Sequence, residues 1–192
     1  MIAALRAWGV SRVVLVVGVA VVVIETTATD QFTLPTIEDR INGWALVPAL
    51  VALTLAEPLV DRSPELTEHA TRSPVVIALA RLALAYAGAV VVAGYCLFSP
   101  EGGVVAAYVL TSLALASVAA ALIGPWYWAP LVPITFAWLQ QTAGAFPRPS
   151  FAIPVAVLVG TVAGSSIVYA GATVIRARPA GRPPGRRRRR RP

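Results

Sequence analysis

Residues 102–123 read GGVVAAYVLTSLALASVAAALI, a run that contains no charged side chain. A helix needs about 20 mainly apolar residues to cross the hydrocarbon core of a bilayer. Because the run is apolar in every direction around a helix axis, it offers no polar face to water. It therefore predicts a membrane span.

Five further apolar runs accompany it. Hydrophobic residues make up 57% of the 192 residues and charged residues 13%, about half the charged share of an ordinary soluble domain. Segments of about ten alternating residues, which would indicate a transmembrane β-barrel, do not occur. We therefore predict an all-α polytopic membrane protein, in which residues 1–175 form a bundle of six transmembrane helices. The spans are expected at 13–28, 41–59, 74–98, 102–123, 130–145 and 151–175.

The distribution of arginine predicts the orientation of the chain. Arg6 and Arg12 precede the first span, Arg62 and Arg72 lie between the second and third spans, and more arginines follow the sixth. Cytoplasmic loops carry an excess of basic residues, so both termini are expected in the cytoplasm. Arginine-only basic usage with abundant Ala and Val favours a high-GC bacterium and its inner, or plasma, membrane. A cleaved signal peptide is the alternative for the first span.

Ionisable and proline residues interrupt two of the spans. Glu57 lies near the end of the second span and Arg81 lies inside the third. Charges at membrane depth pair with each other or extend to the interface, so either a Glu57–Arg81 bridge or two independent interfacial contacts is expected. Pro48 and Pro58 each remove a backbone hydrogen bond and favour a bend in the second span.

Residues that would support catalysis or metal binding are few. The chain has one histidine, His69, and one cysteine, Cys96, which do not provide the ligand set of a usual zinc site. Phosphate-binding and dinucleotide-binding glycine motifs do not occur. We therefore predict that the protein is not an enzyme and has no cofactor and no metal.

The C-terminal segment 176–192, RARPAGRPPGRRRRRRP, is rich in Arg, Pro and Gly, which predicts a disordered tail. Because it follows a membrane span directly, the expected partner is anionic lipid on the cytoplasmic face. Nucleic acid is the less favoured partner. The arginines expected to bind lipid are Arg176, Arg178, Arg182, Arg186, Arg187, Arg188, Arg189, Arg190 and Arg191.

The connection between the second and third spans is the most polar stretch in the middle of the chain. Ser63, Pro64 and Glu65 have the order of a helix start: a capping residue, a proline and an acid. A helix over residues 64–71 would be too short to persist unaided, so it is expected to dock on a partner. The alternative is that these residues only keep the loop soluble. The expected docking residues are Pro64, Glu65, Leu66, Glu68 and His69.

Residues 57–82, EPLVDRSPELTEHATRSPVVIALARL, and the six-span layout resemble the permease subunits of ABC exporters of the type-2 permease class. In that family the same connection is a coupling helix on the ATP-binding subunit. The resemblance implies a permease half that pairs with a second half, as a homo- or heterodimer, and with a separate ATP-binding subunit. The alternatives are a small accessory or structural membrane protein with a docking loop and tail, and a proton-coupled carrier.

Overall fold

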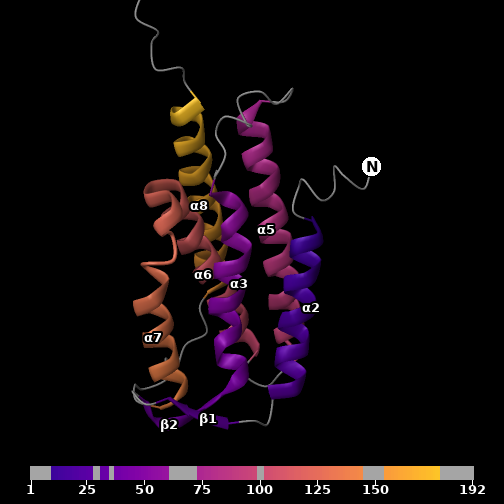
Figure 1. Ribbon diagram of the computed structural model, residues 1–192, viewed down its shortest axis with the longest axis vertical. Helices are drawn as coiled ribbons and strands as arrows, with labels where there is room; N and C mark the ends of the chain where they lie inside the picture. The colour runs from indigo at the N-terminus through magenta and orange to yellow at the C-terminus, as the bar shows by residue number, and fades with distance from the viewer. Residues whose placement is uncertain are drawn as a thin grey trace, which may run out of the picture.

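The computed structural model describes residues 10–27, 31–34, 37–60, 73–98, 102–144 and 154–177, and these are mainly helical (Figure 1). The predicted all-α character is confirmed at this level, although a short two-stranded sheet is also present. The elements in chain order are α2 (Val10–Thr27), β1 (Gln31–Leu34), β2 (Ile37–Asn42), η1 (Gly43–Leu46), α3 (Val47–Ala56), η2 (Glu57–Leu59), α5 (Pro74–Cys96), α6 (Gly102–Ile123), η3 (Gly124–Trp126), α7 (Leu131–Thr142) and α8 (Val155–Ala177).

Among the described residues, α2, α5, α6 and α8 are long and apolar enough to cross a membrane. The 23 residues of α5 extend over about 35 Å, which exceeds the roughly 30 Å of a hydrocarbon core. The helices in the second and fifth predicted spans are shorter, because α3 has 10 residues and α7 has 12. Turns and 3-10 segments lengthen both of these regions.

The two prolines of the second span lie at the ends of its helical parts. Pro48 is in the first turn of α3, and Pro58 is in the first turn of η2. Proline lacks an N–H group and is tolerated in the first turn of a helix, where that group has no partner in the helix. The expected bend within one helix is therefore replaced by a division into η1, α3 and η2, which together cover Gly43–Leu59.

The short helix α3 lies at the centre of the bundle (Figure 1). It contacts α2, α5, α6 and α7, and its residues Val51, Ala52 and Ala56 have no exposed surface. The neighbouring α6 is also mostly buried, whereas α2 and α8 expose most of their length. A helix with apolar residues on every side is stable only where other elements or lipid surround it, and here other helices surround α3.

A β-hairpin joins α2 to η1 at one end of the bundle, the lower end in Figure 1. Its strands are antiparallel, with Gln31 opposite Asn42 and Thr33 opposite Arg40. The sequence predicts a loop up to residue 40 and a second span that begins at residue 41. In the structure β2 continues through Asn42, and Ile41 is fully buried. This hairpin was not predicted.

Close packing of α5 against α2 and α3 gives a test of the arrangement. A Cβ atom at Gly88 would lie 2.7 Å from Cγ1 of Val13 and 3.3 Å from Cδ1 of Leu55, whereas a Cβ atom at Gly94 meets nothing within 4 Å. Gly88→Leu is expected to lower the free energy of unfolding by about 1–3 kcal/mol through overpacking. Thermal unfolding in detergent measures this, with Gly94→Leu on the same helix as control. Equal effects of the two substitutions would contradict the packing.

Candidate functional site

An ion pair joins α2 to the end of the second span. Nη1 of Arg12 lies 2.9 Å from Oε2 of Glu57, and the two side chains are 45% and 30% exposed. Arg12 is in the first turn of α2, and Glu57 begins η2. Because charges at membrane depth are costly unless they are paired or reach the interface, this contact stabilises two charged groups and fixes the beginning of α2 beside the end of α3.

For Glu57 and Arg81 the sequence allows either a bridge or two independent interfacial contacts, and in the structure Glu57 is paired with Arg12. Within the described ranges, no ion pair joins Glu57 to Arg81, which is half-buried on α5. The physical reason lies at the start of the first helix. α2 begins at Val10 rather than at residue 13, so Arg12 becomes part of the helix and reaches the neighbouring α3–η2 region.

Three side chains from the C-terminal half donate hydrogen bonds to backbone carbonyls of the second span. Nε1 of Trp138 donates to the oxygen of Ala45 at 2.7 Å. The hydroxyl of Tyr127 donates to Leu53 at 2.8 Å, and that of Tyr169 donates to Leu59 at 2.9 Å. Carbonyls at helix ends lack partners within the helix, and unsatisfied groups are costly where water is excluded. These bonds therefore hold α3 and its 3-10 ends in place.

Further polar contacts link the other helices. The hydroxyl of Tyr86 on α5 lies 2.6 Å from Oγ of Ser165 on α8. Tyr108 on α6 donates to Oε1 of Gln141 on α7 at 2.6 Å, and its ring lies 3.8 Å from that of Trp138, centre to centre. Among the described residues, no buried side-chain nitrogen or oxygen lacks a hydrogen bond. These contacts connect α5 to α8 and α6 to α7.

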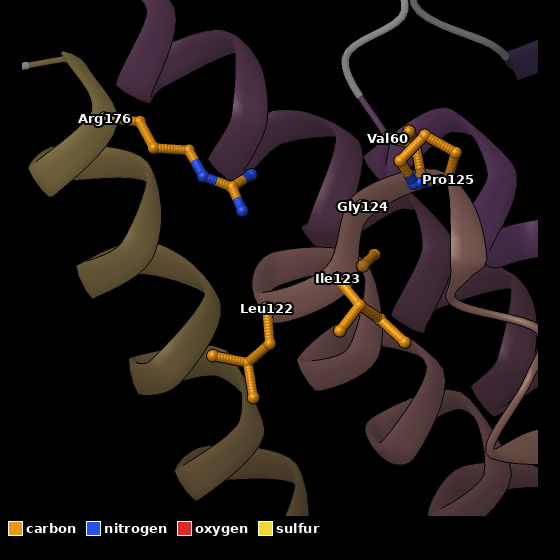
Figure 2. A pocket seen from close by; sticks show the side chains of 7 residues that line it. Val60, Leu122, Ile123, Gly124, Pro125 and Arg176 are labelled. Carbon is orange, nitrogen blue, oxygen red and sulfur yellow. The ribbon is translucent and has the colours of Figure 1, made fainter.

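A pocket of about 370 Å³ lies at the end of the bundle where α6 and α8 terminate. Figure 2 shows the Arg176 side chain extending from α8 into the space between α8 and the end of α6. The guanidinium donates a hydrogen bond to the backbone oxygen of Ala121 on α6. The labelled residues that line the pocket are Val60, Leu122, Ile123, Gly124, Pro125 and Arg176.

Most residues of the other predicted sites lie outside the described part of the chain. The expected docking residues Pro64, Glu65, Leu66, Glu68 and His69 belong to the segment between η2 and α5. Of the arginines expected to bind lipid, Arg176 is described and the others, from Arg178 onward, are not. Docking by residues 64–69 and lipid binding by the tail therefore stay predictions. Of the lipid-binding arginines, Arg176 alone can be related to its surroundings in the structure.

Two observations on the described residues concern metal ligands and cysteine. The described residues contain no group of three or more His, Cys, Asp or Glu residues placed to hold a metal ion. Cys96 is a buried cysteine on α5. Comparison of the chain with protein-family models, curated proteins and solved structures found no match. The arrangement of the residues themselves is thus the basis of the functional argument.

Sequence reasoning missed Arg12 and the three aromatic donors. Trp138 and Tyr169 lie well inside predicted spans, whereas aromatic residues of the interfacial belt lie near span ends. A donor-bearing aromatic residue inside an apolar run needs a partner, and this was the signal available. The identity of the partner carbonyls depends on tertiary packing, which the sequence pattern does not specify.

The contact between Trp138 and Ala45 can be tested against a matched tryptophan. Trp138 is 4% exposed, whereas Trp126 is 62% exposed. Trp138→Phe is expected to lower the free energy of unfolding by about 1–3 kcal/mol, because a buried hydrogen bond and part of the ring packing are both lost. Trp126→Phe should change it by less than about 0.5 kcal/mol. Chemical denaturation in detergent, followed by fluorescence, compares the two; a larger loss for Trp126 would refute the assignment.

The Arg12–Glu57 ion pair predicts a coupling that the alternative pair lacks. Replacing both residues by Gln should cost less stability than the sum of the single replacements, with a coupling of at most about 1 kcal/mol because both side chains are partly exposed. The same cycle with Arg81→Gln and Glu57→Gln should be additive. Coupling confined to Arg81 and Glu57 would instead restore the pair expected from the sequence.

Proposed function

We propose that the chain is a six-span membrane subunit of a larger assembly, in the inner membrane of a bacterium. The residues before α2 and after α8 are placed on the cytoplasmic side, and the β1–β2 hairpin on the outer side. The observation that supports this is the position of Arg12 and Arg176 at the same end, because cytoplasmic ends of spans carry an excess of arginine. Arg12 contacts Glu57 in η2, and the pocket beside η2 contains Arg176. The polar segment 61–72 begins at this same end.

In the second and fifth spans, α3 and α7 are too short to cross a hydrocarbon core alone. The 3-10 segments extend α3 to the 17 residues of Gly43–Leu59, the lower limit of about 17 for a span. Residues 124–130, which precede α7, form η3 and turns, and Ala129 and Leu131 donate backbone bonds to Trp126 and Trp128. Most of residues 124–130 are exposed, and Trp126 and Trp128 are suited to the membrane interface. The fifth span is therefore proposed to consist of this interfacial segment followed by α7.

Within this assembly, we assign the chain the role of a permease-like subunit of an ABC-type exporter. The segment 61–72 follows η2 directly, so a force on that segment reaches α3. Tyr127, Trp138 and Tyr169 bond to carbonyls of the second span. A displacement of α3 would therefore move α7 and α8 with it. This is the linkage that a subunit driven by a separate ATP-binding partner requires.

We propose a substrate path outside the interior of the described bundle. The interior of the described bundle is filled by apolar side chains of α3, α5 and α6. The path is therefore assigned to the boundary between this chain and a second half, either another copy or a related chain. The exposed length of α8 supports this assignment, because it leaves one side of the bundle without a protein neighbour.

A small accessory or structural membrane protein is the second candidate function. The same apolar, hydrogen-bonded interior favours it, because such a bundle is suited to a fixed scaffold. In this case the polar segment and the tail serve only as attachment points. The two candidates differ in whether the protein attached at residues 61–72 hydrolyses ATP.

Charge reversal in the polar segment tests the docking proposal. Glu65→Lys with Glu68→Lys is expected to reduce co-purification of an ATP-binding protein from membranes at least several-fold, because acidic groups that face a basic partner become repulsive. Mass spectrometry of tagged protein from its native host, at matched expression, measures the change. Glu38→Lys with Asp39→Lys, an equal charge change on the hairpin at the opposite end, is the control.

Three outcomes of that comparison have different meanings. Loss of an ATP-binding partner only in the Glu65/Glu68 variant supports the permease assignment. Loss of a partner without ATP-binding capacity supports the accessory role. Identical partner lists for the wild type and both variants would eliminate the docking role of the segment.

A further inference from the structure

The pocket between the ends of α6 and α8 has the features of a phosphate site. We propose that it binds the phosphate group of an anionic membrane lipid, with Arg176 as the charged ligand. The inference depends on the membrane location of the bundle and is independent of transport and of any ATP-binding partner. Four observations support it: the position of the pocket relative to the membrane, the charge inside it, its apolar rim and its size.

Along the membrane normal, the pocket lies at the level of the lipid headgroups. Arg176 lies 21 residues after the first residue of α8, a rise of about 32 Å. Ala121 lies 19 residues after the first residue of α6, a rise of about 29 Å. Both values approach the roughly 30 Å thickness of the hydrocarbon core. The contact between Arg176 and Ala121 therefore lies at the boundary where lipid phosphates begin.

Two nearby tryptophans also indicate that the pocket lies at the level of the headgroups. Trp126 and Trp128 follow the pocket residue Pro125 in sequence, and they are 62% and 43% exposed. Their ring centres lie 5.6 Å apart. Exposed tryptophan is enriched at the level of headgroups, where its apolar ring and polar N–H are both accommodated. The pocket thus opens beside an aromatic pair suited to the interface.

The charge inside the pocket favours an anion. In the described part of the chain, Arg176 is the single charged residue among those that line it. A guanidinium has five N–H donors arranged in a planar fork. One donates to Ala121, and this contact orients the group toward the pocket, as Figure 2 shows. The remaining donors match the oxygens of a phosphate, which arginine binds through two parallel hydrogen bonds.

The apolar rim favours a lipid over free phosphate. Leu122 and Ile123 are 65% and 46% exposed, and Val60 and Pro125 complete the apolar lining. A free ion gains nothing from such residues, whereas the glycerol and first methylenes of a lipid lose water-exposed apolar surface against them. The pocket volume of about 370 Å³ equals the liquid volume of about a dozen waters, which leaves room for a phosphate and its neighbouring atoms.

The experiment measures binding of one defined lipid to the full-length protein in detergent. Dioleoyl phosphatidylglycerol is added at increasing concentration, and the rise in the unfolding temperature gives an apparent dissociation constant. Arg176→Gln is expected to raise that constant about tenfold, the value expected for a lost charge-assisted contact. Arg40→Gln on β2 changes the net charge equally at the other end of the bundle, and it should raise the constant less than about twofold because Arg40 is exposed and its charge is screened.

Two further variants distinguish lipid binding in the pocket from an effect on folding and from lipid binding by the tail. Arg176→Lys keeps a positive charge without the planar fork, so it should bind more weakly than the wild type and more tightly than Arg176→Gln. Replacing Arg186 through Arg191 by Gln removes most of the basic tail. It should weaken the non-specific, salt-dependent part of binding. The ratio of the dissociation constants with Arg and with Gln at position 176 should stay the same.

The lipid controls distinguish the source of the phosphate. Dioleoyl phosphatidylcholine, which has no net charge, should stabilise the wild type and Arg176→Gln equally. Inorganic phosphate alone should give little stabilisation; a saturable effect equal to that of phosphatidylglycerol would overturn the lipid assignment in favour of a free anion. Equal phosphatidylglycerol binding by the wild type, Arg176→Gln and Arg40→Gln would overturn the site altogether.

Discussion

The structure depends on satisfying the backbone carbonyls of its second span. That span is divided by Pro48 and Pro58 into two 3-10 segments and a helix of 10 residues. A single long helix satisfies its own backbone, but a divided one exposes carbonyl groups at each junction. In an apolar interior each such group must find a donor. Trp138 and Tyr169 supply donors to Ala45 and Leu59 in the 3-10 segments, and Tyr127 supplies one to Leu53 in the last turn of α3. These bonds hold α7 and α8 against the second span.

This constraint also explains the division of the bundle into an inner and an outer part. α3 and α6 are enclosed, whereas α2 and α8 expose most of their surface. The outer helices are attached through a few polar contacts at their ends and middles, such as Arg12 with Glu57 and Tyr86 with Ser165. In apolar surroundings, helix association relies on close packing and on such hydrogen bonds, because burial of apolar surface gives little advantage over contact with lipid.

The long apolar runs were predictable from the sequence because length and composition decide them. The run at 102–123 has the same bounds in the structure as in the sequence, and the third begins at Pro74 as expected. The hairpin was missed because it depends on pairing between residues such as Gln31 and Asn42. The partner of Glu57 was missed for a related reason. Sequence order suggested Arg81 on the next span, whereas packing placed Arg12 of the preceding helix beside it.

The chain order of the three donors has a consequence for biosynthesis. Tyr127, Trp138 and Tyr169 are all translated after the carbonyls that they satisfy, and Tyr169 follows Leu59 by 110 residues. At about 5–20 residues per second, the ribosome needs roughly 5–20 s to make that interval. During that time the carbonyl groups of the interrupted second span lack the donors that bond to them in the finished bundle. Insertion machinery or a temporary neighbour must therefore shelter it, and the bundle closes only when the last helix has left the ribosome.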